Sequence, residues 1–432
     1  MKDKISIILS FAWLRWMLRF RSTSELHIFQ LKMLNKQFGY LRQKSPYFQD
    51  LPVLTTLDDL RQIPIMSKQI MMDNFNEMNT VGVEVQDALK LAIDEERSRQ
   101  FTSLHNDLSF GLSSGTSGHR GLFVVSRVER RLWAAAVLAK FLPRRKLSGH
   151  RIAFFLRANN NLYEAVGSHF IKFEYFDIYQ DMDTHIARLK TYQPTILVAP
   201  PSVLAVLADA VERGLLKLSP QKIISVAEVL TSADEHRFKH VFNVSVIHQA
   251  YQCTEGFVAY SCEDGTIHIN EDSVYVEKEW IDDVRYVPII TDFRRKSQPI
   301  VRYRLNDVIR QRLTPCSCGS YFEMIETIEG REDDIFYFDS TNDGTTRVYA
   351  DMLGRCMLYV KGLSEYRIVQ TAPRKIVIYL AYDTSAIRAQ IKNELGQLAD
   401  RLQFSMPRIQ FAAYERDLTK KLKRIERTFD IS

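Results

Sequence analysis

The alternation of hydrophobic and polar positions predicts different structures in successive parts of the chain. Over residues 1–100 apolar residues recur mainly at helical spacing, and two amphipathic helices are expected at 23–44 and 84–98. Residues 100–330 alternate short apolar runs with helical patterns, which predicts an α/β fold with a largely parallel sheet. The expected strands are 151–156, 195–198, 222–226, 244–247, 273–276, 287–290 and 308–310, and the expected helices are 129–141, 183–192, 202–213 and 233–241.

The pattern changes again towards the C-terminal end. Strand-like runs at 366–369, 375–380 and 408–411 surround a helix expected at 384–402. Strands that are followed by a single long helix are typical of a small α+β unit.

We therefore expect an α/β protein of two domains. A large N-terminal α/β domain with mixed sheets would span residues 1–330 and would begin with a largely helical lead-in over 1–100. A small, mobile C-terminal α+β domain would span 331–432, and a hinge would join the two. The chain has 432 residues, of which 46% are hydrophobic, and this suffices for both cores.

The apolar run at residues 5–20 is not predicted to cross a membrane, because it is short and Arg15 and Arg19 interrupt it. It also lacks the small-residue cleavage site of a signal peptide. A packed amphipathic helix is the favoured interpretation. The alternative is a helix at a membrane surface, since Trp13 and Trp16 beside the two arginines suit a headgroup boundary.

Charge and cysteine content narrow the classes of function. A net charge of +6 is mild and fits an anionic ligand such as a nucleotide. No basic tract is interleaved with aromatic residues, so no nucleic-acid partner is expected. Five cysteines are an odd, sparse set, which favours a reducing compartment over a disulfide framework and predicts a cytoplasmic protein.

Two of these cysteines, Cys316 and Cys318, form a Cys-x-Cys pair. The pair gives only two of the four ligands of a structural zinc site, and Cys253 and Cys262 would have to supply the others. A plain turn is therefore the favoured interpretation of the pair.

A candidate phosphate-binding loop with the sequence SSGTSGHRG lies between strand-like runs at 108–112 and 122–126. Its glycines allow tight turns, and successive N–H groups together with hydroxyls can surround phosphate oxygens. No Gly-Lys-Ser/Thr closes the loop, so it is not a Walker A loop, and taken alone it also suits a surface turn. The residues expected to bind are Ser113, Ser114, Gly115, Thr116, Ser117 and Gly118.

Three later motifs add candidate chemistry. Thr254 and Glu255 stand side by side before Gly256, and such a pair can hold one phosphate oxygen and one magnesium ion. Asp307 follows a strand-like run and can accept both hydroxyls of a ribose. Taken singly, these are also a simple turn and a capping or ion-paired aspartate, and Lys421 in LTKKLKR is a solvated basic tail.

Taken in order, the motifs resemble those of the adenylate-forming enzymes, which comprise acyl-CoA synthetases, peptide-synthetase adenylation domains and luciferases. The phosphate loop resembles Ser-Ser-Gly-Thr-Thr-Gly-x-Pro-Lys, residues 251–255 resemble Tyr-Gly-x-Thr-Glu, and residues 303–307 resemble Tyr-Arg-Thr-Gly-Asp. Residues 330–334 resemble the Gly-Arg-x-Asp-Asp hinge of this superfamily. Lys421 resembles its C-terminal catalytic lysine.

A closer resemblance is to the phenylacetate-CoA ligase branch and its capsule-biosynthesis relatives. It rests on residues 45–68, on the sequence PIVRYR at 299–304 and on CSCG at 316–319. This resemblance implies an enzyme that uses ATP and Mg²⁺ to activate a carboxylic acid, aromatic or acyl, as an acyl-adenylate with release of pyrophosphate. Transfer of the acyl group to a thiol such as that of CoA would follow.

The resemblance also implies a role for each site residue, with positioning and charge neutralisation carrying the catalysis. By this resemblance, the β- and γ-phosphates would be contacted by Ser114, Thr116 and Ser117, and phosphate and Mg²⁺ would be bound by Thr254 and Glu255. Tyr251 would contact the adenine, and Asp307, assisted by Arg331, would bind the ribose. Lys421 would bridge the carboxylate, the α-phosphate and the ribose oxygen, and Asp333 would be the hinge.

The chain departs from the family pattern at three places. Gly121 stands where the phosphate loop usually ends in lysine, and Lys420 replaces the glycine before the catalytic lysine, so that either Lys420 or Lys421 can act. Register with Arg424 favours Lys421. Residues 335–344 lack the basic residues usual in enzymes that make CoA thioesters. The phosphopantetheine of an acyl or peptidyl carrier protein, or an amine, is therefore an alternative acceptor, and a non-catalytic nucleotide-binding descendant is an alternative of another class.

Overall fold

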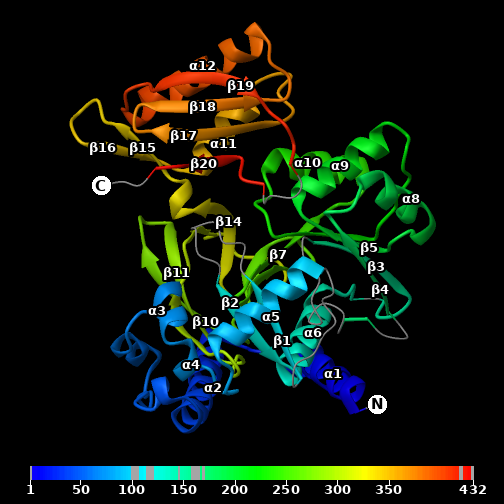
Figure 1. Cartoon of the computed structure of the whole chain (residues 1–432), viewed down its shortest axis with the longest axis vertical. Coiled ribbons are helices and arrows are strands. Elements are labelled where there is room, and N and C mark those ends of the chain that lie inside the picture. Colours follow the sequence, from blue (N-terminus) through cyan, green and yellow to red (C-terminus); the bar gives the residue numbers. More distant parts are fainter. Residues whose placement is uncertain are drawn as a thin grey trace.

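The protein contains one large mixed sheet with helices on both faces and a smaller α+β region near the C-terminal end (Figure 1). The computed structural model describes residues 2–98, 107–112, 121–144, 146–156, 166–167, 171–417 and 422–429, with the backbone alone at 2–4, 333, 351, 355 and 358. Within these residues the expected α/β class with mixed sheets is confirmed.

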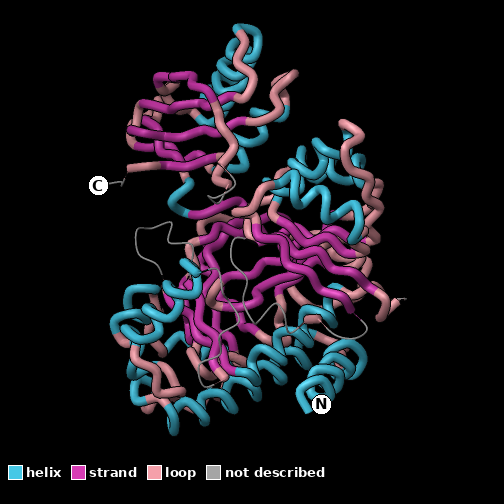
Figure 2. Tube along the Cα trace, turned by 45° about the vertical axis from the view of Figure 1, so that its right-hand side comes forward, coloured by secondary structure: helices cyan, strands magenta, loops and turns pink. Residues whose placement is uncertain are grey.

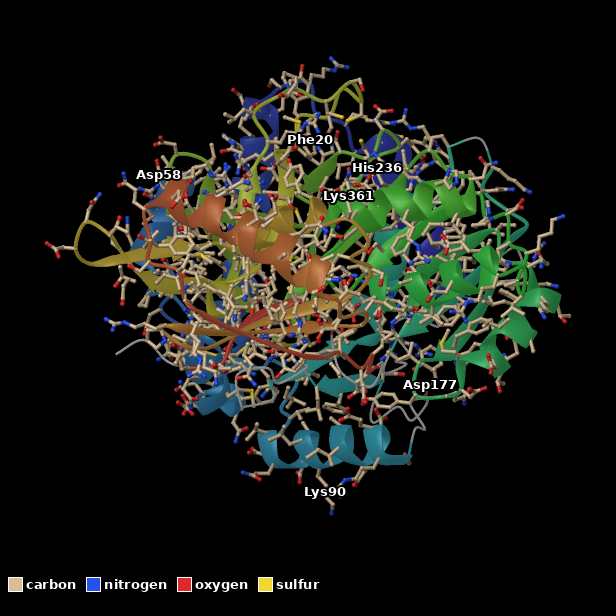
Figure 3. The ribbon with its side chains drawn as sticks, turned by 90° about the horizontal axis from the view of Figure 1, so that it is seen from above. Phe20, Asp58, Lys90, Asp177, His236 and Lys361 are labelled. Carbon is tan, nitrogen blue, oxygen red and sulfur yellow. The ribbon has the colours of Figure 1, made fainter. Side chains whose placement is uncertain are left out.

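Residues 2–98 are largely helical, as their helical periodicity predicts. The expected helices at 23–44 and 84–98 are observed almost residue for residue, and Ser22 caps the first of them by accepting a hydrogen bond from the N–H of Glu25 at 3.1 Å. The elements are α1 (Lys2–Ala12), the π-helical turn η1 (Trp13–Met17), α2 (Thr23–Lys44), η2 (Pro46–Phe48), η3 (Leu57–Gln62), α3 (Lys68–Asp73), α4 (Phe75–Met78) and α5 (Val85–Ser98). Seen from above, Lys90 on α5 projects outward at the rim of the molecule (Figure 3).

The N-terminal helix packs on the body of the protein through η1. Leu14 is buried, and the guanidinium of Arg15 donates to the carbonyl oxygens of Ala139 and, at 2.9 Å, Leu142. Arg15 thereby satisfies carbonyl groups at the C-terminal end of a second helix. On α1 itself, the side chains of Ile8 and Leu9 are more than half exposed to solvent. Among the described helices none is both long and apolar enough to cross a membrane.

The large sheet has twelve strands among the described residues, in the order β10-β11-β13-β14-β9-β8-β7-β6-β5-β3-β4, with β12 paired to β11. The run from β3 to β7 is parallel and the remaining pairs are antiparallel, so the sheet is less parallel than the sequence predicts. The strands are β3 (His150–Leu156), β4 (Ile171–Asp177), β5 (Ile196–Ala199), β6 (Lys222–Val226), β7 (Ile247–Cys253), β8 (Gly256–Ser261), β9 (Ile267–Ile269), β10 (Val274–Trp280), β11 (Arg285–Asp292), β12 (Ile300–Arg304), β13 (Asp307–Gln311) and β14 (Met324–Arg331).

Helices cover both faces of the parallel part of this sheet. Successive side chains of a strand point to opposite faces, so Phe155 packs beneath one helical layer while Phe154 packs beneath the other. The first layer consists of α8 (Met182–Tyr192), α9 (Pro201–Glu212) and α10 (Ser232–Phe242), and the second of α6 (Arg127–Phe141) with α1 behind it. A two-stranded hairpin, β1 (Leu108–Leu112) and β2 (Leu122–Ser126), leads into α6.

The C-terminal region has its own sheet and its own core. Figures 1 and 2 show it above the large sheet, with α12 on its outer side. Its four-stranded sheet has the order β19-β18-β17-β20, and α11 and α12 contribute to its core with Leu353 and Ile391. The elements are η4 (Glu332–Asp334), β15 (Phe336–Asp339), β16 (Thr345–Val348), α11 (Ala350–Leu358), β17 (Tyr366–Ala372), β18 (Lys375–Leu380), α12 (Ser385–Leu402), β19 (Arg408–Ala413) and β20 (Ile425–Arg427).

A buried carboxylate fixes the start of α6. Glu129 is only 7% exposed and accepts hydrogen bonds from the backbone N–H groups of Ser126 (2.7 Å), Lys296 (2.6 Å) and Ser297 (2.9 Å). It also accepts from the hydroxyl groups of both serines. Burial alone would raise the pKa of Glu129, but Arg295 and these hydroxyl groups outweigh it, and the pKa lies below its ordinary value. The ionised form therefore stabilises the fold.

We expect Glu129→Gln to destabilise the protein by about 3 kcal/mol at neutral pH, because the amide would place N–H groups against donors in a dry site. The lowered pKa gives a second expectation. The stabilisation by Glu129 is present above the unfolded-state pKa of about 4.5 and is lost as the pH falls through the lower folded-state value. When urea unfolding is measured from pH 7 to pH 3, the free energy of unfolding should fall less in the variant than in the wild-type protein. The exposed capping residue Glu25, changed to Gln, is the matched control, and equal unfolding midpoints for all three proteins would contradict the expectation.

Candidate active site

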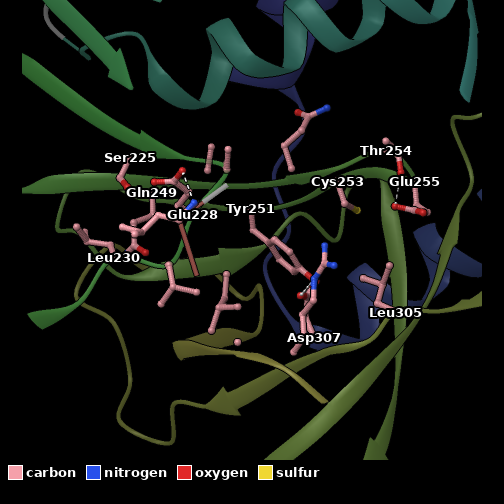
Figure 4. A pocket seen from close by; sticks show the side chains of 18 of the residues that line it. Ser225, Glu228, Leu230, Gln249, Tyr251, Cys253, Thr254, Glu255, Leu305 and Asp307 are labelled. Atoms are coloured by element: carbon pink, nitrogen blue, oxygen red, sulfur yellow. Dashed lines mark hydrogen bonds and ion pairs between the residues drawn. The ribbon is translucent and has the colours of Figure 1, made fainter. Parts of the chain in front are cut away.

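A cavity of about 1320 Å³ lies between the large sheet and the C-terminal region. Its walls come from the carboxyl ends of the parallel strands, from β13 and β14, and from the segment that follows residue 421. In open α/β sheets ligands bind at this end of the strands. Figure 4 shows that Tyr251, Glu255 and Asp307 all face this space.

Three side chains that the sequence analysis singled out meet at the floor of the cavity. The hydroxyl of Tyr251 on β7 donates a hydrogen bond to Asp307, the first residue of β13 (Figure 4). Asp307 is paired across the strands with Arg331, and the Arg331 Nε lies 3.8 Å from the Asp307 Oδ1. Burial, and next Asp307, raises the pKa of Tyr251, so that the phenol stays protonated and acts as a donor.

Thr254 and Glu255 form the tight turn between β7 and β8. The Thr254 hydroxyl donates to the Glu255 carboxylate at 2.8 Å, and an Arg295 N–H donates to the Thr254 carbonyl oxygen at 3.0 Å. Burial raises the pKa of the nearby Tyr303, and its interaction with Glu255 raises it further. A carboxylate and a hydroxyl thus stand together at the cavity wall, which is the oxygen chemistry that Mg²⁺ prefers.

The predicted phosphate loop joins β1 and β2. The two strands pair antiparallel, and Leu112 lies opposite Leu122, which confirms the strand-like runs expected on either side of the loop. The loop residues Ser113, Ser114, Gly115, Thr116, Ser117 and Gly118 lie outside the described residues. Gln298 holds the hairpin through β2: its amide oxygen accepts from the Val124 N–H at 2.8 Å, and its amide N–H donates to the Leu122 carbonyl oxygen at 3.0 Å.

The predicted hinge is the short turn η4, which contains Asp333 and follows Arg331. Asp334 accepts a hydrogen bond from the N–H of Arg331 at 3.1 Å, and the Nζ of Lys423 lies 3.3 Å from its other oxygen. Burial raises the pKa of Asp334, and Lys423 only partly offsets this. The segment around Lys423, near the C-terminal end, thus contacts the η4 turn.

Lys420 and Lys421 lie outside the described residues, and the segment directly after them borders the cavity. The N–H of Leu422 donates to the Glu228 carboxylate at 3.0 Å, and the Arg424 guanidinium pairs with Asp234 at the start of α10. These contacts place the C-terminal segment against the carboxyl edge of the parallel strands.

A smaller cavity of about 180 Å³ lies between α6 and the parallel strands. The two cavities adjoin, and six residues line both: Trp133, Leu156, Ala227, Ala250, Gln252 and Phe257. The Trp133 indole N–H donates to the Gln252 amide oxygen at 2.8 Å, which leaves an almost wholly apolar lining. The other side chains that line it are Val137, Leu138, Phe141, Leu142, Ile152, Phe154, Val166, Phe173, Ile196, Val198, Ile224 and Val226.

Among the polar and aromatic residues that line the cavity and were not foreseen from the sequence are Trp133, Glu228, Arg295 and Lys423. A signal was available for Glu228, because it follows the predicted strand 222–226 at the carboxyl edge of the parallel strands. Trp133 and Arg295 reach the site only through long-range packing.

Comparison with known proteins agrees with this architecture. No protein-family profile matches the chain. It is 22% identical to protein CapK of Staphylococcus aureus over 399 residues, which is 87% of this chain and 83% of CapK.

Among solved structures, the chain is similar to 2-hydroxyisobutyryl-CoA ligase in its postadenylation state, with a TM-score of 0.72, 16% identity and coverage of 95% of this chain and 90% of that one. It is also similar to an anthranilate CoA ligase in complex with anthranoyl-AMP, with a TM-score of 0.53, 15% identity and coverage of 74% and 66%. The chain therefore has the fold of the adenylate-forming ligases.

Proposed function

We propose that this protein activates a carboxylic acid with ATP, forming an acyl-adenylate and pyrophosphate, and then passes the acyl group to a thiol such as that of CoA. The observation that carries this proposal is the convergence of Tyr251, Asp307 and Arg331 with the Thr254–Glu255 turn on one large cavity. The fold and the similarity to CapK support it.

The residues present suit a bound nucleotide. Asp307 would accept the ribose hydroxyl groups, with Arg331 beside it, and Tyr251 would lie against the adenine. Glu255 would hold the magnesium ion, which would neutralise phosphate charge, with Thr254 on a phosphate oxygen. The serines and Thr116 of the loop between β1 and β2 would surround the β- and γ-phosphates.

The chemical difficulty of the reaction is the meeting of two anions. A carboxylate oxygen of the acid bonds to the α-phosphorus, and the bond from that phosphorus to the pyrophosphate oxygen breaks. Lys421 would bridge the carboxylate, the α-phosphate and the ribose oxygen, and so lower their repulsion. Leu422, its neighbour in the chain, is anchored at the cavity wall by Glu228, which supports this assignment.

The smaller cavity supports an acid with an apolar body. A volume of about 180 Å³ without charged lining residues suits a single ring or a short branched chain, since an apolar cavity of ~150 Å³ binds benzene. The acid would place this body beneath α6 and leave its carboxylate near Gln252, where the two cavities meet.

The C-terminal region is proposed to act as a domain, residues 331–432, that swings about Asp333 between the two half-reactions. The similarity to 2-hydroxyisobutyryl-CoA ligase is greater in its postadenylation state, at a TM-score of 0.72, than in its thioesterification state, at 0.58. This supports an adenylate-forming arrangement here. The strand that follows the hinge, β15, has no basic residue. This supports the alternative in which the acyl group passes to the phosphopantetheine of a carrier protein, or to an amine, instead of CoA.

Acid-dependent ATP–pyrophosphate exchange tests the adenylation step. With a panel of aromatic and short branched acids, Lys421→Ala should lower the rate by roughly 100-fold or more, because it removes the cation at the reacting centre. Lys420→Ala is the matched control and should retain most activity. Exchange that is equal in all three proteins, or absent with every acid, would contradict the proposal.

Enlargement of the smaller cavity should change the choice of acid. We expect Trp133→Ala to lower kcat/KM for the preferred acid by roughly 10- to 100-fold, with a smaller loss for bulkier acids and an unchanged KM for ATP. Trp280→Ala, at a half-exposed tryptophan on β10, is the control. A uniform loss across all acids would show that Trp133 does not shape the acid site.

Removal of the ion pair between Arg424 and Asp234 should release the C-terminal region from the helices that cover the large sheet. Arg424→Ala leaves the largely buried Asp234 unpaired, at a cost of about 3 kcal/mol to the closed arrangement. The radius of gyration in small-angle X-ray scattering should therefore rise. Arg388→Ala, which breaks an ion pair with Asp383 within the C-terminal region itself, should leave the radius unchanged. A compact Arg424→Ala protein would refute this role.

A further inference from the structure

A second cluster of reactive side chains lies outside the cavity. It consists of Cys262 directly after β8, His268 within β9, and Cys316 and Cys318 in the loop between β13 and β14. One ligand atom from each residue lies within 4.8 Å of all the others. His268 pairs with Met324 at one end of β14, and the cavity-lining Arg331 is at the other end, about 23 Å along the strand.

The distances within the cluster fit a metal ion. The sulfur atoms of Cys262 and Cys316 are 3.7 Å apart, and the sulfur of Cys318 is 3.4 Å from the Nε2 of His268. Tetrahedral zinc with bonds of about 2.3 Å to sulfur and about 2.05 Å to nitrogen requires separations of about 3.8 and about 3.6 Å. A disulfide would need about 2.05 Å between sulfur atoms, and all of these cysteines are free.

The surroundings orient the ligands towards the same point. The Nδ1 of His268 lies 3.1 Å from the carbonyl oxygen of Phe322, so it donates its proton there and leaves the Nε2 lone pair towards Cys318. The N–H of Cys318 points to the sulfur of Cys316 at 3.5 Å, which favours a thiolate. His268 and Cys262 are buried, whereas Cys316 and Cys318 are half-buried, so the cluster lies at the edge of the packed interior.

Glycine turns in the backbone bring together the two segments of the cluster, the turn between Cys262 and His268 and the loop that carries Cys316 and Cys318. In the turn between Cys262 and His268, Gly265 has a φ of +86°, and the N–H of Cys262 donates to the Thr266 carbonyl at 2.9 Å. Gly319, directly after Cys318, has a φ of +73°. Both values are readily adopted only by glycine, so each arm of the cluster carries a residue suited to its turn.

We propose that Cys262, His268, Cys316 and Cys318 bind one zinc ion in a structural site. Thiolate and imidazole ligands select zinc over magnesium or calcium, and four protein ligands leave no open position for catalysis. The ion would fasten the loop between β13 and β14 to the β8–β9 hairpin. Strands β13 and β14 carry Asp307 and Arg331 at the end opposite this loop. The metal would therefore stabilise the strands that line the cavity without touching a substrate.

Metal analysis tests this directly. The full chain, purified without a histidine tag from cells grown with zinc, should contain one zinc ion per chain by plasma mass spectrometry. Cys316→Ser and Cys318→Ser should lose it, whereas Cys356→Ser, at a buried cysteine in the C-terminal region, should keep it. Substoichiometric zinc in the wild-type protein, or full zinc in both loop variants, would overturn the proposal.

A second measurement holds even if the variants fold poorly. Chelation of the wild-type protein should lower its melting temperature, and added zinc should restore it. Replacement of zinc by Co²⁺ should give the intense visible bands of tetrahedral cobalt with thiolate charge transfer in the near ultraviolet. A chelated protein with an unchanged melting temperature, or a cobalt protein without these bands, would refute the site. Neither readout depends on adenylation.

Discussion

The arrangement of the cavity depends on one buried carboxylate. Glu129 is held by two separate stretches of chain, the start of α6 and the turn at 296–297, so its charge fixes the position of one relative to the other. That turn is flanked by Arg295, which binds the carbonyl of Thr254, and Gln298, which binds the β1–β2 hairpin. A buried anion with several donors is costly to disturb, because any loss leaves charge or donors unsatisfied in a dry interior. The two proposed phosphate-binding elements are therefore positioned by a residue that need not touch phosphate.

Local patterns were sufficient for much of the fold. The helices at 23–44 and 384–402 are observed because both begin at a capping hydroxyl, on Ser22 and Thr384, and carry an apolar stripe. The strand expected at 244–247 is displaced and begins at Ile247. Asn243 takes a left-handed conformation that ends α10, and the chain needs three further residues before it joins the sheet. Tyr251, four residues beyond the end of the expected strand, consequently lies within β7.

What the sequence could not show is determined by contacts between distant residues. Tyr251 and Asp307 are 56 positions apart and meet because β7 and β13 belong to one sheet. A plain turn was expected for the Cys-x-Cys pair, because the pair supplies only two of four zinc ligands and both Cys253 and Cys262 would have had to supply the others. The structure brings Cys262 to the pair as considered, but His268 takes the place of Cys253, which lies at the cavity. No local pattern marks a histidine inside a three-residue strand as a partner of a loop some fifty residues later.

The two kinds of contact that hold the C-terminal region differ in how they respond to the surroundings. Next to η4 the contact includes an apolar cluster of Val308, Ile335 and Tyr349, together with the ion pair of Arg304 with Glu332. Farther away it is polar, with Arg416 beside Asp209 and Arg424 beside Asp234. Apolar packing is insensitive to salt and the largely buried Arg424–Asp234 pair is little screened, whereas the more exposed Arg416–Asp209 pair is screened within about 10 Å at 0.1 M ionic strength. In the proposed swing of the C-terminal region, the apolar cluster beside η4 would persist at high salt and act as the pivot, whereas raised ionic strength would weaken the Arg416–Asp209 contact and favour the open arrangement.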